Sequence, residues 1–349
     1  MKRLKKIASI FLILQVVFVK LLTFFSDKVE FFYSNKFYPV INRFLLNLFG
    51  NFSFSIGDII YGALILLLIK WFYVSRINFF INWKSNGLTL LSFISIFYFL
   101  FHFLWAINYY RIPLNEKLNI NKDYTYEQLI SFTKNKINVV NSLQYAITKN
   151  KNLPVKIKYA DSTIYKIAEK GYENLPNNLK EFSYKKRSIK KSLFSIPLSY
   201  MGFGGYFNPF THEAQFNYNK PRYTLPVTIC HEMAHQVGIG SESECNFIGY
   251  ITANKTNDLY FKYSANCLAL RYALKHLERI EANSSLPYVS KLNLGVKKNF
   301  EESEIYWKKH DSPISDFFEW FYDNFLKINH QKDGMESYSK FVGLVINYE

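Results

Sequence analysis

Three long apolar runs in the first third of the chain constrain its fold more than any other feature of the sequence. They cover about residues 7–25, 56–74 and 88–107, and each is close to the roughly 20 residues that an α-helix needs to cross a bilayer. Their strong charges lie near the ends, where long side chains reach the interface: Lys20, Asp58 and Lys70. We therefore expect residues 1–108 to form a membrane region with three transmembrane helices.

The basic N-terminus indicates a cytoplasmic start. The first run lacks an A-x-A-like cleavage site and two further runs follow it, which argues against a cleaved signal peptide. Three spans from an inside start place residues 109–349 outside the cytoplasm. We expect a multi-pass protein of the inner (cytoplasmic) membrane with an extracytoplasmic domain, although basic residues between the first two runs weaken the charge contrast: Lys28, Lys36 and Arg43.

The formal net charge of +16 is weak support for a nucleic-acid partner. An abundance of Lys, Asn, Ile, Phe and Tyr is typical of biased genome composition, and an extracytoplasmic domain rarely meets nucleic acid. The densest basic cluster, residues 185–191, is interpreted as a solvated face. The partners we expect are membrane lipid and a protein or peptide substrate, and the sequence leaves the oligomeric state open.

Cysteine usage also narrows the possibilities. The 3 cysteines are Cys230, Cys245 and Cys267. They form an odd set without a C-x-x-C pair, so they do not indicate a disulfide framework. We expect buried thiols that pack as small apolar side chains, with a thiolate metal ligand as a lesser alternative.

The part beyond the third run is predicted to be mainly α-helical with a small β element. Tyr109 to Asp123 is interpreted as an extended linker. Thr125 and Gln128 have capping-box spacing for a helix to about residue 148. Glycines, prolines and alternating stretches over residues 195–223 indicate a hairpin or a sheet edge. Further helices are expected over residues 162–172, 259–281, 303–309 and 315–328, and before Tyr348.

The sequence His231-Glu232-Met233-Ala234-His235 is an H-E-x-x-H motif in an apolar, helix-compatible stretch. Two histidines four residues apart lie on one face of a helix, where both can bind one Zn²⁺ ion. The glutamate beside that face can take a proton from metal-bound water. With 7 histidines in the chain, a chance match is on the order of one in a hundred. We expect a metal helix over about residues 226–237.

A catalytic zinc site needs a third protein ligand and an open fourth position. Glu242 and Glu244 follow the motif after a glycine turn. Ser241 and Glu244 have capping-box spacing for a helix over about residues 241–253, which leaves Glu242 as the expected ligand and Glu244 as the alternative. Asn246, one turn after Glu242, is placed to accept from the second ring nitrogen of a ligand histidine.

These residues resemble the gluzincin-type zinc peptidases. Glu242-Ser243-Glu244-Cys245-Asn246 is similar to the E-x-x-[small]-[D/N] helix of that clan. Residues 229–250, residues 207–217 and the three apolar runs resemble a bacterial family of uncharacterised membrane members of the clan. The resemblance implies a zincin-like α+β domain, zinc at His231, His235 and Glu242, and Glu232 as general base. The short connection between His235 and Glu242 departs from many gluzincins.

The function that follows is hydrolysis of peptide bonds by a membrane-anchored zinc metallopeptidase. The oxyanion needs a further donor, and the candidates by residue type are Tyr206, His212, Tyr223 and Tyr338. A strand around residues 211–217 is expected to bind an extended peptide along its edge, with at most one of His212 and Glu213 facing the cleft. Two alternatives remain open: a cell-envelope binding or assembly protein with a structural or inactive zinc site, for example with Glu242 and Glu244 both bound, and a zinc hydrolase of a non-peptide amide.

Overall fold

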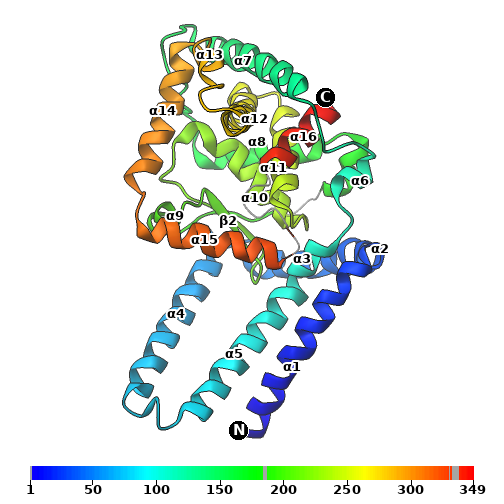
Figure 1. Ribbon diagram of the computed structural model, residues 1–349, viewed down its shortest axis with the longest axis vertical. Coiled ribbons are helices and arrows are strands. Elements are labelled where there is room, and N and C mark those ends of the chain that lie inside the picture. The colour runs from blue at the N-terminus through cyan, green and yellow to red at the C-terminus, as the bar shows by residue number, and fades with distance from the viewer. Residues whose placement is uncertain (1, 184–186, 330, 332–337) are drawn as a thin grey trace.

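Three apolar helices stand below the rest of the molecule in the computed structural model (Figure 1). The structure describes residues 2–183, 187–329, 331 and 338–349. Within them, three segments are long and apolar enough to cross a membrane: Arg3–Phe24, Ile56–Ser75 and Trp83–Leu104. The N-terminus and the α4–α5 connection lie at the end of these helices that faces away from the remainder of the chain. The elements are α1 (Lys2–Leu21), η1 (Leu22–Phe24), α4 (Ile56–Ser75), η3 (Arg76–Asn78) and α5 (Trp83–Leu104).

The segment between the first two apolar helices is itself helical. It comprises α2 (Ser26–Lys28), the π-helix η2 (Val29–Phe37) and α3 (Tyr38–Phe49). The buried residues of α3 recur at the spacing of one helix face: Tyr38, Asn42, Leu45 and Leu46. Its other side exposes Val40, Phe44 and Leu48. α3 therefore lies across the junction between the apolar helices and the domain above them (Figure 1).

The expected linker over residues 109–123 is also partly helical. It begins inside η4 (Ala106–Tyr110) and contains α6 (Leu114–Leu118). Ala106, Asn108 and Tyr110 are buried, because this stretch packs against the domain instead of crossing solvent. The expected boundary between the membrane region and the domain, at residues 108 and 109, thus falls inside the 3₁₀ helix η4.

A small sheet carries the expected hairpin. Its strands are β1 (Ile189–Lys191), β2 (Gly205–Asn208) and β3 (Glu213–Phe216), in the order β1-β3-β2. β2 pairs antiparallel with β3, with Gly205 opposite Phe216, and β1 pairs parallel with it. The strand expected at the sheet edge, β3, is therefore central, and all four of its residues are buried. The residues before the hairpin form the short helix α9 (Ser195–Tyr200).

Helices surround this sheet and form most of the domain. α12 (Leu259–Ile280) packs against α7 (Tyr126–Thr148) and α11 (Glu242–Asn254). The expected capping box of α7 is confirmed, since Thr125 and Gln128 bond reciprocally to each other's backbone. α14 begins nine residues before the expected helix start at residue 303. The elements are α7 (Tyr126–Thr148), α8 (Asp161–Glu173), η5 (Asn177–Phe182), η6 (Arg222–Thr224), α10 (Leu225–Gln236), α11 (Glu242–Asn254), α12 (Leu259–Ile280), α13 (Leu286–Val289), α14 (Leu294–Lys309), α15 (Pro313–Ile328) and α16 (Tyr338–Tyr348).

The sheet holds the beginning of α4. The buried Glu213 carboxylate accepts hydrogen bonds from the backbone N–H groups of Ile56 (3.1 Å) and Gly57 (2.6 Å). An anionic acceptor at a helix N-terminus satisfies otherwise unpaired N–H groups and interacts favourably with the helix dipole. The second apolar helix is therefore fixed to the domain at its first turn. Of the expected basic cluster at residues 185–191, Lys185 and Lys186 lie outside the described residues. The interpretation of the cluster as a solvated face is wrong for Arg187 and Lys190, whose side chains are buried, and holds for Lys191.

Candidate metal centre

The H-E-x-x-H motif lies on α10, and the expected bounds of both helices at the site are confirmed to within one residue. Pro226 stands in the first turn of α10, where its missing N–H costs no hydrogen bond. After α10, Gly238 adopts a left-handed conformation with φ of 86°, which a residue without a Cβ adopts readily. This turn reverses the chain and brings α11 back against α10.

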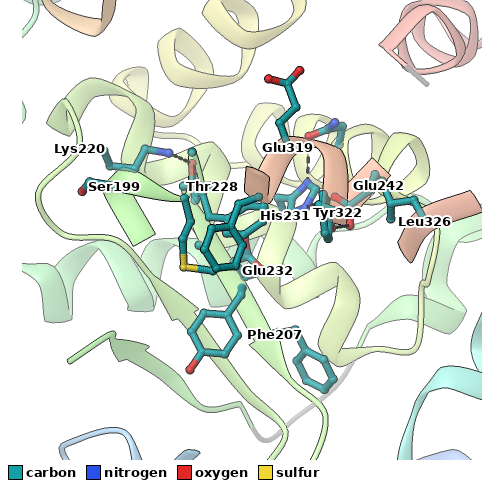
Figure 2. Close-up of a pocket in the computed structure, with 18 of the residues that line it drawn as sticks. Ser199, Phe207, Lys220, Thr228, His231, Glu232, Glu242, Glu319, Tyr322 and Leu326 are labelled. Atoms are coloured by element: carbon teal, nitrogen blue, oxygen red, sulfur yellow. Dashed lines mark hydrogen bonds and ion pairs between the residues drawn. The ribbon is translucent and has the colours of Figure 1, made fainter. Parts of the chain in front are cut away.

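The motif residues converge on one point. Ligand atoms of His231, Glu232 and His235 all lie within 4.8 Å of one another. His235 and Glu232 are buried, and the His231 side chain is 14% exposed. Figure 2 shows His231, Glu232, Glu242 and Tyr322 gathered along the pocket that α10 borders. The arrangement is one that could hold a metal ion.

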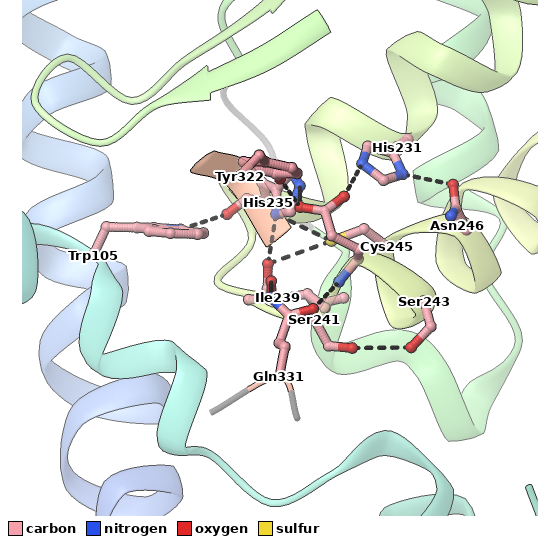
Figure 3. A network of polar contacts seen from close by, with 12 residues as sticks. Trp105, His231, His235, Ile239, Ser241, Ser243, Cys245, Asn246, Tyr322 and Gln331 are labelled. Carbon is pink, nitrogen blue, oxygen red and sulfur yellow. Dashed lines mark hydrogen bonds and ion pairs between the residues drawn. The ribbon is translucent and has the colours of Figure 1, made fainter. Parts of the chain in front are cut away.

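The Nδ1 atoms of His231 and His235 are both engaged in hydrogen bonds that point away from the site. His231 Nδ1 lies 2.9 Å from Asn246 Oδ1, and His235 Nδ1 lies 2.9 Å from the Ile239 carbonyl. Since both partners are acceptors, each ring donates its Nδ1 proton to its partner, which leaves Nε2 as the atom available to bind a metal. The predicted contact between Asn246 and a motif histidine is confirmed, and Figure 3 shows it beside the His235 contacts.

Glu242 places its carboxylate against both Nε2 atoms. Its Oε2 lies 3.2 Å from His231 Nε2, and its Oε1 lies 3.4 Å from His235 Nε2. Burial by itself raises the pKa of Glu242, but the two histidines outweigh it and hold the pKa well below its usual range. Glu242 is therefore an anion that faces the two nitrogen donors.

Glu244 points elsewhere, and the expected Ser241–Glu244 capping box does not form. Glu244 Oε1 accepts a 2.7 Å hydrogen bond from the Leu114 backbone N–H at the start of α6. The Ser241 side chain makes no cap hydrogen bond and instead contacts the Ser243 hydroxyl. The Leu114 N–H takes the Glu244 carboxylate in place of the local cap, because a buried N–H that is left without an acceptor is costly. The Glu242 carboxylate, and not that of Glu244, faces the histidines.

Glu232 is held against the edge of the sheet. A Cβ added to Gly205 of β2 would lie 2.6 Å from Glu232 Oε1, so only glycine permits this approach. Glu232 Oε2 is buried and finds no hydrogen-bond partner among the described residues. Burial raises the pKa of this carboxyl; the two histidines and Lys220 oppose the shift, and the Glu242 carboxylate adds to it. The glutamate thus keeps one oxygen for a group that enters the pocket.

Lys220 adds a cation to the same pocket, which sequence reasoning missed. Its Nζ donates to the Thr228 hydroxyl on α10, as Figure 2 shows. Burial lowers the pKa of Lys220 to about 8, and the nearby Glu232 opposes that shift. Lys220 lies in the loop between β3 and α10, and no motif marks it.

The residues expected to stabilise an oxyanion are engaged elsewhere. The Tyr206 hydroxyl bonds to Asp58 of α4, and the Tyr223 hydroxyl lies 2.6 Å from Ser303 Oγ. His212 is fully buried, with Nδ1 2.9 Å from Asn42 Oδ1. Neither His212 nor Glu213 faces the cleft, since both hold the apolar helices and α3 against the sheet. The side chain of Tyr338 lies outside the described residues.

Tyr322 of α15 is the hydroxyl donor that the structure brings to the site. It donates a 2.7 Å hydrogen bond to Glu242 Oε1. Burial, together with the neighbouring carboxylates, raises the pKa of Tyr322 well above its usual range, so the hydroxyl keeps its proton. Tyr322 follows His235 by 87 residues in the sequence, and nothing in its own helix distinguishes it from the other aromatic residues.

A large cavity of about 1670 Å³ opens beside these residues. Its lining includes the motif residues, most of the β2 strand, much of α15 and residues near the ends of α4 and α5. β2 is an edge strand of the sheet, so its outer side can accept a further strand. The expectation of an edge strand beside the site is met by β2 in place of residues 211–217.

The residues around the end of the third apolar helix hold the turn that follows α10. The Tyr38 hydroxyl donates to the Gln236 carbonyl at 2.9 Å, and Arg111 Nη1 donates to the Gly238 carbonyl at 2.8 Å.

The three cysteines are buried and form no disulfide, as expected. Cys245 Sγ lies 3.2 Å from His235 Nδ1, and burial raises its pKa to about 12, so it is a neutral thiol.

The donor set fits a zinc ion in both type and number. Two imidazole Nε2 atoms and one carboxylate are the ligands of many catalytic zinc sites, which leave a fourth position for water. The hydrogen bonds at both Nδ1 atoms fix the tautomer that such ligation needs. One buried oxygen of Glu232 has no hydrogen-bond partner among the described residues, and Glu232 belongs to the same group of metal-ligand atoms as the two histidines.

Over residues 33–346 the chain matches the family described as "Protein of unknown function (DUF3810)". Because this match covers most of its length, the chain belongs to that family. The comparisons with curated proteins and with solved structures give no match.

Proposed function

We propose that this member of the DUF3810 family is a membrane-anchored zinc metallopeptidase that hydrolyses peptide bonds. His231, His235 and Glu242 would hold the ion, and Glu232 would act as general base. The observation that carries this proposal is the position of the Glu242 carboxylate, 3.2 and 3.4 Å from the two Nε2 atoms of the motif. The resemblance to gluzincin-type peptidases is part of the same proposal.

When bound, zinc would lower the pKa of a water molecule towards about 7 and polarise the scissile carbonyl. Glu232 Oε2, which is buried and has no partner among the described residues, accepts the proton as the water oxygen attacks the carbonyl carbon. Glu232 then gives that proton to the leaving nitrogen as the C–N bond breaks. Its raised pKa suits both steps, because the group must take a proton and release it.

Tyr322 is the donor that we assign to the carbonyl oxygen. Its raised pKa keeps the hydroxyl protonated, and its hydrogen bond to Glu242 keeps it at the ligand group. The β2 strand is assigned to the substrate backbone. An extended peptide paired with its outer edge would run past Gly205, against which Glu232 packs.

The location that we propose follows from the apolar helices. Three helices of spanning length suggest anchoring in the bilayer. The basic residues at the start of α1 favour a cytoplasmic N-terminus, and the domain lies at the opposite end of these helices (Figure 1). We therefore propose an extracytoplasmic catalytic domain on the inner membrane, with lipid as its constant partner.

The alternatives differ in what the same site would do. A closed structural site with both Glu242 and Glu244 as ligands is disfavoured, because Glu244 is bonded to the Leu114 N–H. A hydrolase of a non-peptide amide would use the same residues, since activated water attacks any amide carbonyl.

The test is the zinc content and peptidase activity of the full-length protein in detergent. Wild type, Glu242→Gln, Glu244→Gln and Glu232→Gln are compared, each checked for folding. We expect about one zinc per chain in wild type, Glu244→Gln and Glu232→Gln, and loss of zinc in Glu242→Gln. A degenerate peptide mixture should be cleaved by wild type and by Glu244→Gln only.

A folded wild-type protein without zinc would overturn the metal site. Zinc without cleavage of any peptide would overturn the peptidase and favour one of the two alternatives.

A further inference from the structure

α15 has an apolar side that the domain does not cover. Ile314, Phe317 and Ile328 recur on one face of the helix, are between 54% and 77% exposed, and do not line the cavity. Figure 1 shows α15 lying across the ends of α4 and α5, at the base of the domain. An exposed aromatic and aliphatic face of this kind suits the boundary between headgroups and acyl chains.

The apolar side of α15 continues the surface of the third apolar helix. The Phe325 ring lies 5.9 Å from that of Phe101, which is in the last turn of α5, and 6.4 Å from that of Tyr109. α3 exposes Val40, Phe44 and Leu48 at the same junction. If the three apolar helices cross a bilayer, α3 and α15 therefore lie at its surface.

The inner side of α15 reaches the candidate metal centre. Tyr322 donates to Glu242 Oε1, and Leu326 lines the same cavity. Figure 2 places Tyr322 and Leu326 beside Glu242. α15 therefore lies between the candidate metal centre and the ends of the apolar helices.

The cavity itself extends below that level. Its lining includes Tyr61 in the second turn of α4 and Phe97 two turns before the end of α5. Between them and the motif it is lined by further aromatic residues, among them Phe101 and Phe210. The lower end of the cavity is therefore apolar and lies within the apolar helices, whereas the upper end holds the two histidines and Glu232.

We propose that the substrate is the juxtamembrane segment of a membrane-inserted protein, which enters this cavity from the bilayer beneath α15. An apolar side chain of that segment would occupy the aromatic end of the cavity by Tyr61 and Phe97. A polar peptide from solution has no side chain whose burial there would be favourable. The adjoining residues would extend along the free edge of β2 and past Glu232. This inference rests on the proposed function and names its substrate class.

The experiment uses the full-length protein in vesicles of phosphatidylethanolamine and phosphatidylglycerol. The probe is a degenerate peptide segment fused to an apolar transmembrane helix. In one form the segment follows the helix directly, and in the other a flexible Gly/Ser spacer of about 30 residues separates the two. Both probes are tethered to the same bilayer, so tethering alone does not distinguish them. Cleavage is followed by mass spectrometry, with Glu232→Gln as the inactive control.

We expect the directly joined segment to be cleaved at least about tenfold faster than the spaced one. Phe97→Gln should remove this difference, since it puts a polar amide into the aromatic end of the cavity. The matched control is Phe99→Gln: both phenylalanines are on α5 and 40% exposed, but Phe99 does not line the cavity, so this variant should keep the preference.

Equal cleavage of both probes, or an equal effect of the two substitutions, would overturn the inference and leave the peptidase standing. Cleavage of neither probe by a zinc-loaded wild-type protein would overturn the proposed function, and this inference with it.

Discussion

The indole N–H of Trp105 donates a 2.9 Å hydrogen bond to the backbone carbonyl of His235. This bond joins the residue that ends α5 to the second histidine of the motif, as Figure 3 shows. The carbonyls of a helix's last turn lack partners within the helix. At α10, Trp105, Tyr38 and Arg111 supply partners for the carbonyls of the last residues and of the following turn, so the apolar helices and the candidate site form one packed unit.

Trp105→Phe removes this donor and keeps an aromatic ring. We expect the full-length protein to lose about 1 kcal/mol of stability, because one buried hydrogen bond is lost, while the His235 carbonyl keeps the 3.0 Å bond from the Gly238 N–H. The midpoint of thermal unfolding in detergent measures this. Trp320→Phe is the matched control, since Trp320 is 63% exposed. An equal shift for both variants would contradict a specific role for the Trp105 bond.

Asn246→Ala removes the acceptor 2.9 Å from His231 Nδ1. We expect zinc affinity to fall by about 10- to 100-fold, the usual cost of losing a group that orients a ligand histidine. Asn246→Asp keeps an acceptor and should retain the affinity. Competition with a chelating dye measures both, and an unchanged affinity in Asn246→Ala would show that the ring needs no such support.

Tyr322→Phe removes the hydroxyl that donates to Glu242 Oε1. If this hydroxyl stabilises the oxyanion, turnover should fall by about 10²-fold while zinc content stays the same. Tyr145→Phe changes a tyrosine that is 48% exposed and distant from the cavity lining, and should leave turnover unchanged. Loss of zinc in Tyr322→Phe would instead assign Tyr322 to holding Glu242.

Gly205→Ala places a methyl group 2.6 Å from Glu232 Oε1 and 2.7 Å from the Gln215 carbonyl. Because the backbone cannot yield as easily as the carboxylate, Glu232 should be displaced. A shift of about 1 Å in a reacting group can cost about 10²-fold in rate, so we expect turnover to fall with zinc retained. Gly87→Ala is the control, since its Cβ would meet nothing within 4 Å. Full activity in Gly205→Ala would argue against Glu232 as the base.

Acid should weaken the contact between η2 and the segment after α5. Glu30 lies 2.7 Å from both Arg111 Nη2 and Lys117 Nζ. Burial raises the pKa of Glu30, but these two cations outweigh it and lower the pKa from 4.5 to about 2. The folded pKa is below the unfolded one, so this stability is present above about pH 4.5 and is lost as the pH falls towards 2.

Comparison of unfolding midpoints with Glu30→Gln isolates this contribution. The amide does not titrate, so the variant should be less stable near neutral pH and should approach wild type in acid. A constant difference between the two proteins at every pH would contradict the prediction.

Local patterns allowed the candidate site to be found from the sequence. The H-E-x-x-H spacing places His231 and His235 on one helix face, and the Asn246 contact follows from the turn spacing of the next helix. Glu242 could be named but not separated from Glu244 by spacing alone. The choice depended on the Leu114 N–H, which comes from a segment some 130 residues away in the sequence and engages Glu244.

Residues that act through long-range contacts left no local signal. Tyr322, Lys220 and Gly205 reach the site from α15, the β3–α10 loop and β2, and each belongs to a residue type that is common in such elements. The expected oxyanion candidates were chosen by type, and the structure gives Tyr206, His212 and Tyr223 other partners. The short helices η4 and α6 were missed because segments of that length fold only when they pack on something else.

The sequence by itself determined the three apolar helices, the metal-binding pattern and the bounds of the two helices that carry it. These properties depend on hydrophobic length and on the 3.6-residue repeat, which act between neighbours in the chain. Only the tertiary structure decided that Glu242 faces the histidines, that Tyr322 joins them, and that Trp105 ties the site to the third apolar helix. Such contacts form where buried donors and acceptors from distant segments must satisfy one another, and no local repeat encodes them.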